Sequence, residues 1–192
     1  ADPGTAWGYY PWTDAEGGDV WFNNTYAGTR TIPYPQAGDY NWLTAIHELG
    51  HALGLKHGHE TDGLTGMAVP AFQDCLEFTV MSYRSYMNAS TTGGYTNESW
   101  GFPTTFMMLD IAALQEMYGA DFTTNGTNTT YTWNENTGEM SLNGVGQGAP
   151  GGNRIFMTVW DGGGIDTYDF SNYTSGPLTI SLAPGGFSIA SD

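Results

Sequence analysis

The apolar residues between positions 40 and 55 recur every three or four places, the period of a helix that buries one stripe. The stripe consists of Leu43, Ile46, Leu49 and Leu53. Asp39 or Asn41 can cap the start of this helix, and Gly54 can end it. The chain must therefore pack this helix against other elements, and every side chain on it points in a defined direction.

Three polar side chains with metal-binding chemistry are attached to this helix or follow it. His47 and His51 stand four residues apart, which places both imidazoles on one face, where they can bind one ion. Gly54 lets the chain turn sharply, so that His57 can return as a third ligand. Three neutral imidazoles leave one position of a tetrahedral zinc ion open for water. This arrangement is typical of a catalytic rather than a structural site.

Glu48 lies beside the two helical histidines and is the candidate general base. Zinc lowers the pKa of a bound water from 15.7 to about 7, so that a nearby carboxylate can take its proton as the water attacks a peptide carbonyl. Glu48 can later protonate the leaving amine. The full HExxHxxGxxH pattern is far more specific than HExxH, which also occurs by chance. The pattern predicts a zinc-dependent endopeptidase, against the alternatives of a chance match and a decayed enzyme.

Downstream of the histidines stands the tetrapeptide 80–83, Val-Met-Ser-Tyr. On its own it could be simple core packing. After the histidine pattern, however, it resembles the methionine turn that defines the metzincin proteases. The resemblance implies that Met81 lies beneath the metal site. A Tyr two places after that Met resembles the serralysin and astacin branches, and implies that Tyr83 is a displaceable zinc ligand that can hydrogen-bond the reacting substrate.

The stretches 110–115 and 118–120 are similar to the helix that follows the methionine turn in serralysins, which are bacterial secreted proteases. Segment 160–171, WDGGGIDTYDFS, is similar to the entry into their calcium-binding β-roll. Carboxylates and the carbonyls exposed by glycines suit a cation that takes six to eight oxygens. The residues that match the family's calcium site are Asn125, Thr127, Thr129, Asp161, Gly163, Gly164 and Asp166. Without that match, an ordinary tight turn would be the simpler interpretation of the Gly-Asp stretch.

The remaining elements are assigned from shorter patterns. Residues 104–118 have the period of a second core helix, with Thr104 or Thr105 as its cap and an apolar stripe. That stripe consists of Met108, Ile111, Ala112, Leu114 and Met117. Strands are predicted at 7–12, 19–23, 129–133, 154–160 and 178–182, and a long irregular segment at 58–101. The expected fold is α+β: a metzincin catalytic domain with a twisted mixed sheet at 1–120, and the start of a β-rich calcium-binding domain at 121–192.

Composition limits the partners. Twenty Asp and Glu against four Lys and Arg give a net charge of -16, so nucleic acid and anionic membranes are not expected to bind. The acidity serves either solubility or calcium binding. The single Cys75 excludes an internal disulfide and is expected to be buried. Expected partners are zinc, calcium, protein or peptide substrates and a proteinaceous inhibitor, for a monomer that the resemblance places outside the bacterial cell.

The sequence departs from the serralysin pattern in four ways. Gly58 replaces the Pro that usually follows the third histidine, and His59 is an additional histidine, expected in an exposed loop. About forty-six residues precede the zinc helix where the family has roughly one hundred, and the tandem GGxGxDxUx repeats do not appear. We therefore expect a processed fragment, a partial chain or a naturally short relative. The alternative function is a non-catalytic module that binds zinc and calcium.

Overall fold

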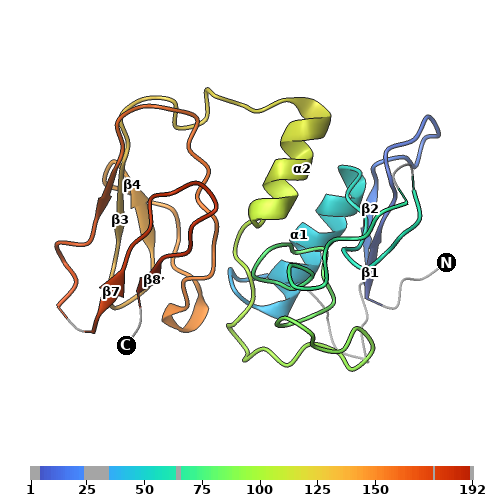
Figure 1. Cartoon of the computed structure of the whole chain (residues 1–192), viewed down its shortest axis with the longest axis horizontal. Coiled ribbons are helices and arrows are strands. Elements are labelled where there is room, and N and C mark those ends of the chain that lie inside the picture. Colours follow the sequence, from blue (N-terminus) through green and yellow to red (C-terminus); the bar gives the residue numbers. More distant parts are fainter. Residues whose placement is uncertain (1–4, 24–34, 64–65, 175, 191–192) are drawn as a thin grey trace.

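The computed structural model describes residues 5–23, 35–63, 66–174 and 176–190. Within these ranges, α1 and the β1–β2 hairpin lie at one end of the molecule, the remaining strands lie at the other end, and α2 lies between them (Figure 1). The bounds are β1 Ala6–Gly8, β2 Val20–Phe22, α1 Tyr40–Ala52, α2 Met108–Tyr118, β3 Thr130–Trp133, β4 Met140–Leu142, β5 Val145–Gly146, η2 Gly151–Asn153, β6 Thr167–Asp169, β7 Leu178–Thr179 and β8 Ile189–Ala190. None of the described helices is long and apolar enough to cross a membrane.

The strands form three separate sheets. β1 and β2 pair antiparallel, as do β7 and β8. The largest sheet has the order β5-β4-β3-β6, in which β3 pairs parallel with β6 and antiparallel with β4. The fold is therefore mixed α+β with a mixed sheet, as the sequence predicts. In the described residues, however, the mixed sheet follows α2 in the chain, and only the β1–β2 hairpin packs beside α1.

Helix α1 begins where the sequence predicts. The Asp39 carboxylate accepts a hydrogen bond from the Trp42 N–H at 2.6 Å and so caps the first turn. The helix ends at Ala52, and Gly54 follows with a φ of 98°, a left-handed conformation that glycine adopts without strain. The predicted apolar stripe is partly wrong, because Leu49 is exposed. Instead, the buried face of the helix carries both histidines.

Helix α2 begins four residues later than predicted, at Met108. Thr104 and Thr105 do not cap it; their side chains and backbone bond to the chain around Phe156 and Thr158. The expected stripe is also partly wrong. Leu114 packs against the core as predicted, but Ala112 and Met117 are exposed, and Met107, Asp110 and Ala113 face the interior instead.

The strand predictions have mixed outcomes. The strand at 129–133 is confirmed as β3, and those at 7–12, 19–23 and 178–182 exist but are shorter. Segment 154–160 is not a strand, because it bonds to the irregular chain before α2 rather than to a regular neighbour. β4, β5 and β6 were not predicted. The described residues of 58–101 contain no helix or strand, as expected, and Cys75 is buried with a free thiol.

The main apolar core lies between α1, the irregular segment and the start of α2. Its buried members are Leu43, Leu55, Leu76, Val80, Met81, Phe102 and Met107. Since these residues come from three parts of the chain, the core fixes the irregular segment against the helix that carries the histidines.

Candidate functional site

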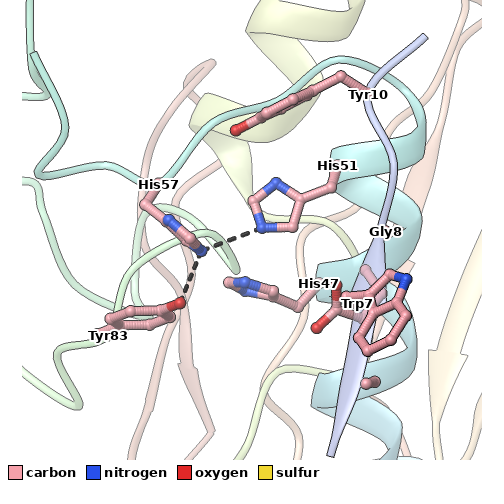
Figure 2. A pocket seen from close by; sticks show the side chains of 9 residues that line it. Trp7, Gly8, Tyr10, His47, His51, His57 and Tyr83 are labelled. Carbon is pink, nitrogen blue, oxygen red and sulfur yellow. Dashed lines mark hydrogen bonds between the residues drawn. The ribbon is translucent and has the colours of Figure 1, made fainter. Parts of the chain in front are cut away.

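The rings of His47, His51 and His57 meet beside α1, although they come from a helix and the turn after it (Figure 2). Their candidate ligand nitrogens all lie within 4.8 Å of one another. Among the described residues, these three histidines form the one group of three or more His, Cys, Asp and Glu side chains close enough together to hold a metal ion. The three histidines predicted as ligands are therefore brought together.

Each of the three rings is oriented by a hydrogen-bond acceptor at its Nδ1. His47 Nδ1 lies 2.8 Å from the Val80 carbonyl oxygen, and His51 Nδ1 lies 2.8 Å from that of Leu55. His57 Nδ1 lies 2.7 Å from Glu60 Oε1. Because these oxygens accept, each Nδ1 carries a proton, and in the neutral form of each ring the Nε2 is then the nitrogen that can bind a metal.

Two of these nitrogens meet directly. His51 Nε2 and His57 Nε2 are 3.0 Å apart, and the Tyr83 hydroxyl lies 2.8 Å from the same His57 nitrogen (Figure 2). Two lone pairs at that distance repel unless a proton or a metal cation lies between them. The donor set of three imidazoles suits zinc, whose tetrahedral sites place ligand nitrogens about 3.4 Å apart. The residues present therefore fit a zinc ion.

Burial keeps two of the imidazoles neutral, the form that binds metals. It lowers the pKa of His47 to about 3 and lowers the pKa of His51 as well. Burial also raises the pKa of the Tyr83 phenol, so this side chain remains protonated at neutral pH and donates its hydrogen bond to His57. Met81 is buried beneath α1, and its sulfur would lie 2.5 Å from a Cβ at position 50, where the helix has glycine.

Glu48 lies next to the three histidines at the wall of an open hollow of about 290 Å³. The hollow is also lined by Ala6, Trp7, Gly8, Tyr10 and Tyr83. Burial raises the pKa of the Glu48 carboxyl, while the Gly8 backbone N–H and His57 act in the opposite direction. A carboxylate so placed can exchange protons with a molecule in the hollow.

Two side chains near the site were not predicted or were placed wrongly. Glu60 was not part of the predicted site, but its carboxylate accepts hydrogen bonds from both the Nδ1 and the backbone N–H of His57. The sequence does contain a signal for this contact, because Glu60 follows His57 by only three residues. His59 is half-buried rather than exposed, and its ring stacks on that of His57 with centroids 5.7 Å apart. It does not belong to the metal-binding group found among the described residues.

The seven predicted calcium residues also lie close together, between the turn before β3 and the turn before β6. The Thr129 hydroxyl lies 2.8 Å from the Thr127 carbonyl oxygen and 3.3 Å from that of Asn125. The Thr129 N–H donates to Asp166 Oδ1 at 2.9 Å.

The other acidic member of this cluster, Asp161, is held by two hydrogen bonds. Its carboxylate accepts from the Gly163 N–H at 2.8 Å and from the Tyr131 hydroxyl at 2.6 Å. A Cβ at position 164 would lie 2.7 Å from the Thr127 carbonyl, so only glycine allows this approach of the two turns. The cluster thus gathers two carboxylates and several backbone carbonyls, the oxygen donors that calcium prefers.

The family model and the relatives that match this chain point to the same family of proteins. Residues 120–190 match the family model described as Peptidase M10 serralysin C terminal. The chain is 34% identical to "Serralysin C" of Dickeya chrysanthemi over 95% of its length, and 35% identical to "Metallopeptidase AprA" of Pseudomonas marginalis over 97%. It is 36% identical to "Serralysin" of Proteus mirabilis over 89%.

These matches show that the chain is related in sequence to metalloproteases. More narrowly, it is serralysin-like over nearly all of its length, which confirms the resemblance seen in the sequence. It spans 36%, 39% and 33% of the lengths of these three relatives, respectively.

Proposed function

We propose that this chain is the zinc-binding part of a secreted endopeptidase of the metzincin type, and that His47, His51 and His57 hold the metal. The observation that carries the proposal is the convergence of the three rings, with His51 Nε2 and His57 Nε2 3.0 Å apart and every Nδ1 bound to an acceptor. Three imidazole ligands leave one coordination position for water. The serralysin-like sequence supports the same assignment.

A zinc ion held by these three histidines would lower the pKa of a bound water to about 7 and would polarise the carbonyl of the substrate. Glu48 would act as the base: its carboxylate lies where it can take a proton from the attacking water and deliver it to the departing amine. Tyr83 donates its phenolic hydrogen bond to the substrate oxygen on which negative charge develops. The substrates are proteins and peptides, whose reacting segment lies in the open hollow beside β1.

A second metal supports the C-terminal part of the chain. We assign calcium to the cluster formed by Asn125, Thr127, Thr129, Asp161, Gly163, Gly164 and Asp166. Asp161 and Asp166 bring two negative charges to the turn before β6, and a divalent cation bound by them and by the carbonyls of the turn before β3 reduces their repulsion. Calcium thus stabilises the packing of β3 against β6, the parallel pair that both turns precede.

The test combines metal content with activity. Mass spectrometry of the purified chain is expected to find one zinc, and casein hydrolysis is expected to stop in a chelator and to resume when zinc is restored. Glu48→Gln is expected to keep the zinc and lose cleavage, because the amide cannot accept the proton. Cleavage that survives this substitution would remove Glu48 from the mechanism. Zinc without any cleavage in the parent chain would favour a non-catalytic module.

A further inference from the structure

Asp110 is a buried carboxylate on the first turn of α2, outside the ring of candidate ligands. Its two oxygens accept three hydrogen bonds. Oδ1 accepts from the Thr79 hydroxyl at 2.5 Å, and Oδ2 accepts from the backbone N–H groups of Val80 at 2.8 Å and Met107 at 2.9 Å. Burial raises the pKa of Asp110 to about 6, while these three bonds lower it. A buried acid with so many partners has a specific structural task.

Two of these partners lead directly to the metal site. Val80 donates its N–H to Asp110 and offers its carbonyl oxygen to His47 Nδ1 at 2.8 Å. Thr79 donates its hydroxyl to Asp110, and the same oxygen accepts from the Met81 N–H at 3.0 Å. The carboxylate therefore holds three consecutive residues of the irregular segment. The middle one of these residues orients the first imidazole.

The irregular segment around these residues is also held by core packing and by single backbone hydrogen bonds, such as that from the Gly58 N–H to the Met81 carbonyl oxygen. In the described structure it contains no helix or strand, so no backbone ladder fixes the direction of the Val80 carbonyl. A carboxylate is acceptor-only and can satisfy all three donors at once, which no apolar residue at this position can do. Without it, two buried backbone N–H groups and the Thr79 hydroxyl would lose their acceptor. The Thr79 oxygen also holds the Met81 N–H, so the peptide that joins Val80 to Met81, and with it the Val80 carbonyl, could rotate.

We propose that Asp110 is a positioning residue of the metal site: it fixes the Val80 carbonyl, and through it the tautomer and direction of the His47 ring. The inference rests on the proposed zinc site, since its consequence is measured as metal affinity. Groups that orient a metal-binding imidazole typically contribute a factor of about 10 to 100 in affinity. The same connection ties the start of α2 to the site.

The experiment compares three variants of the whole chain by competition with a chelator of known zinc affinity. Asp110→Ala removes all three acceptors and is expected to weaken zinc binding by about 10- to 100-fold. Asp110→Asn is the conservative variant. Its carbonyl oxygen can accept from both backbone N–H groups while its amide faces the Thr79 oxygen, so zinc affinity is expected to return to within about threefold of the parent.

Leu114→Ala is the matched control. It shortens a side chain of the same helix that packs against the apolar core but, unlike Asp110, offers no hydrogen-bond acceptor to residues 79–81. It is expected to lower the melting temperature while zinc affinity stays at the parent value. If Leu114→Ala weakens zinc binding as much as Asp110→Ala does, the effect is general destabilisation and the inference fails.

A measurement on metal-free protein separates this inference from the proposed function. Nitrogen-15 NMR of His47 reports which ring nitrogen carries the proton. The parent and Asp110→Asn are expected to hold it on Nδ1, and Asp110→Ala to show a mixture of tautomers. A parent chain that binds no zinc refutes the proposed function, yet the tautomer of His47 still decides the role of Asp110. An unchanged tautomer and unchanged zinc affinity in Asp110→Ala would overturn the inference.

Discussion

Replacing Gly58 with alanine tests how the third histidine is held. A Cβ at this position would lie 2.6 Å from Asp74 Oδ1, about 0.8 Å closer than the 3.4 Å at which ordinary contact begins. Asp74 has little room to retreat, because it is buried, its Oδ2 accepts from Arg84 Nε at 3.0 Å, and its N–H donates to the Pro70 carbonyl oxygen at 3.0 Å. The new methyl group must therefore displace the turn that carries His57.

The magnitude follows from two opposing effects. Overpacking a rigid site costs about 1–3 kcal/mol, while replacing glycine by alanine recovers about 0.4–1 kcal/mol from the unfolded state. We expect a net loss of about 1–2 kcal/mol in the free energy of unfolding, which corresponds to a fall of about 2–8 °C in Tm for a domain of this size. Gly58→Pro is expected to cost more, because the Gly58 N–H that donates to the Met81 carbonyl oxygen at 3.2 Å disappears as well.

Urea unfolding of four proteins provides the assay: the parent, Gly58→Ala, Asp74→Ala and the double variant. With the Asp74 carboxylate gone, the added methyl group has space, so Gly58→Ala is expected to cost less than about 0.5 kcal/mol in that background. Gly93→Ala, in an exposed loop, is the control and is expected to change stability by less than about 0.5 kcal/mol. Equal losses from Gly58→Ala in both backgrounds would refute the proposed clash.

Three further predictions concern single carboxylates. Glu60→Ala is expected to weaken zinc binding by about 10- to 100-fold, because the acceptor for His57 Nδ1 is lost; an unchanged affinity by chelator competition would show that Glu60 does not orient this ring. The pKa of Asp110 in the folded protein, about 6, lies above its ordinary value of 3.8, so the folded state favours the protonated carboxyl. This preference adds about 3 kcal/mol to the free energy of unfolding below pH 4 and is lost as the pH rises through 6. Asp110→Asn should therefore gain stability relative to the parent between pH 4 and 7, and a flat difference in Tm across that range would contradict the assigned shift. Calcium at about 100 times its Kd is expected to stabilise the parent by about 2.7 kcal/mol and Asp166→Ala far less, with magnesium as control; an equal gain in Tm for both proteins would exclude Asp166 as a ligand.

The sequence predicts best those features that depend on neighbours along the chain. The start of α1 at Tyr40 depends on the Asp39 cap three residues before the N–H that it binds, and the position of His51 relative to His47 follows from helical geometry alone. The acceptor for His51 is similarly local, since Leu55 follows it by four residues. Features of this kind are visible in a single stretch of sequence.

Other features depend on partners that are remote in sequence, and here the predictions failed or were not made. Segment 154–160 alternates like a strand, but its neighbour is the irregular chain at 104–107, which offers no ladder. β6 was missed because it acquires its extended pairing from β3, about thirty-seven residues earlier. The face of α2 was misassigned because Asp110, a charged residue, occupies the buried side that an apolar pattern assigns to hydrophobic residues.

The three histidines differ in how far away their orienting groups lie, and this difference has a consequence for folding. His51 and His57 take their acceptors from Leu55 and Glu60, within four residues, whereas His47 depends on Val80, thirty-three residues later. A folded helix and turn would therefore direct two of the three nitrogens by themselves. The third becomes directed only when residues 79–81 pack on α1 and receive support from α2. Tight zinc binding should accordingly depend on the packing of α2 as well as on the histidine motif, even though none of the three candidate histidine ligands belongs to that helix.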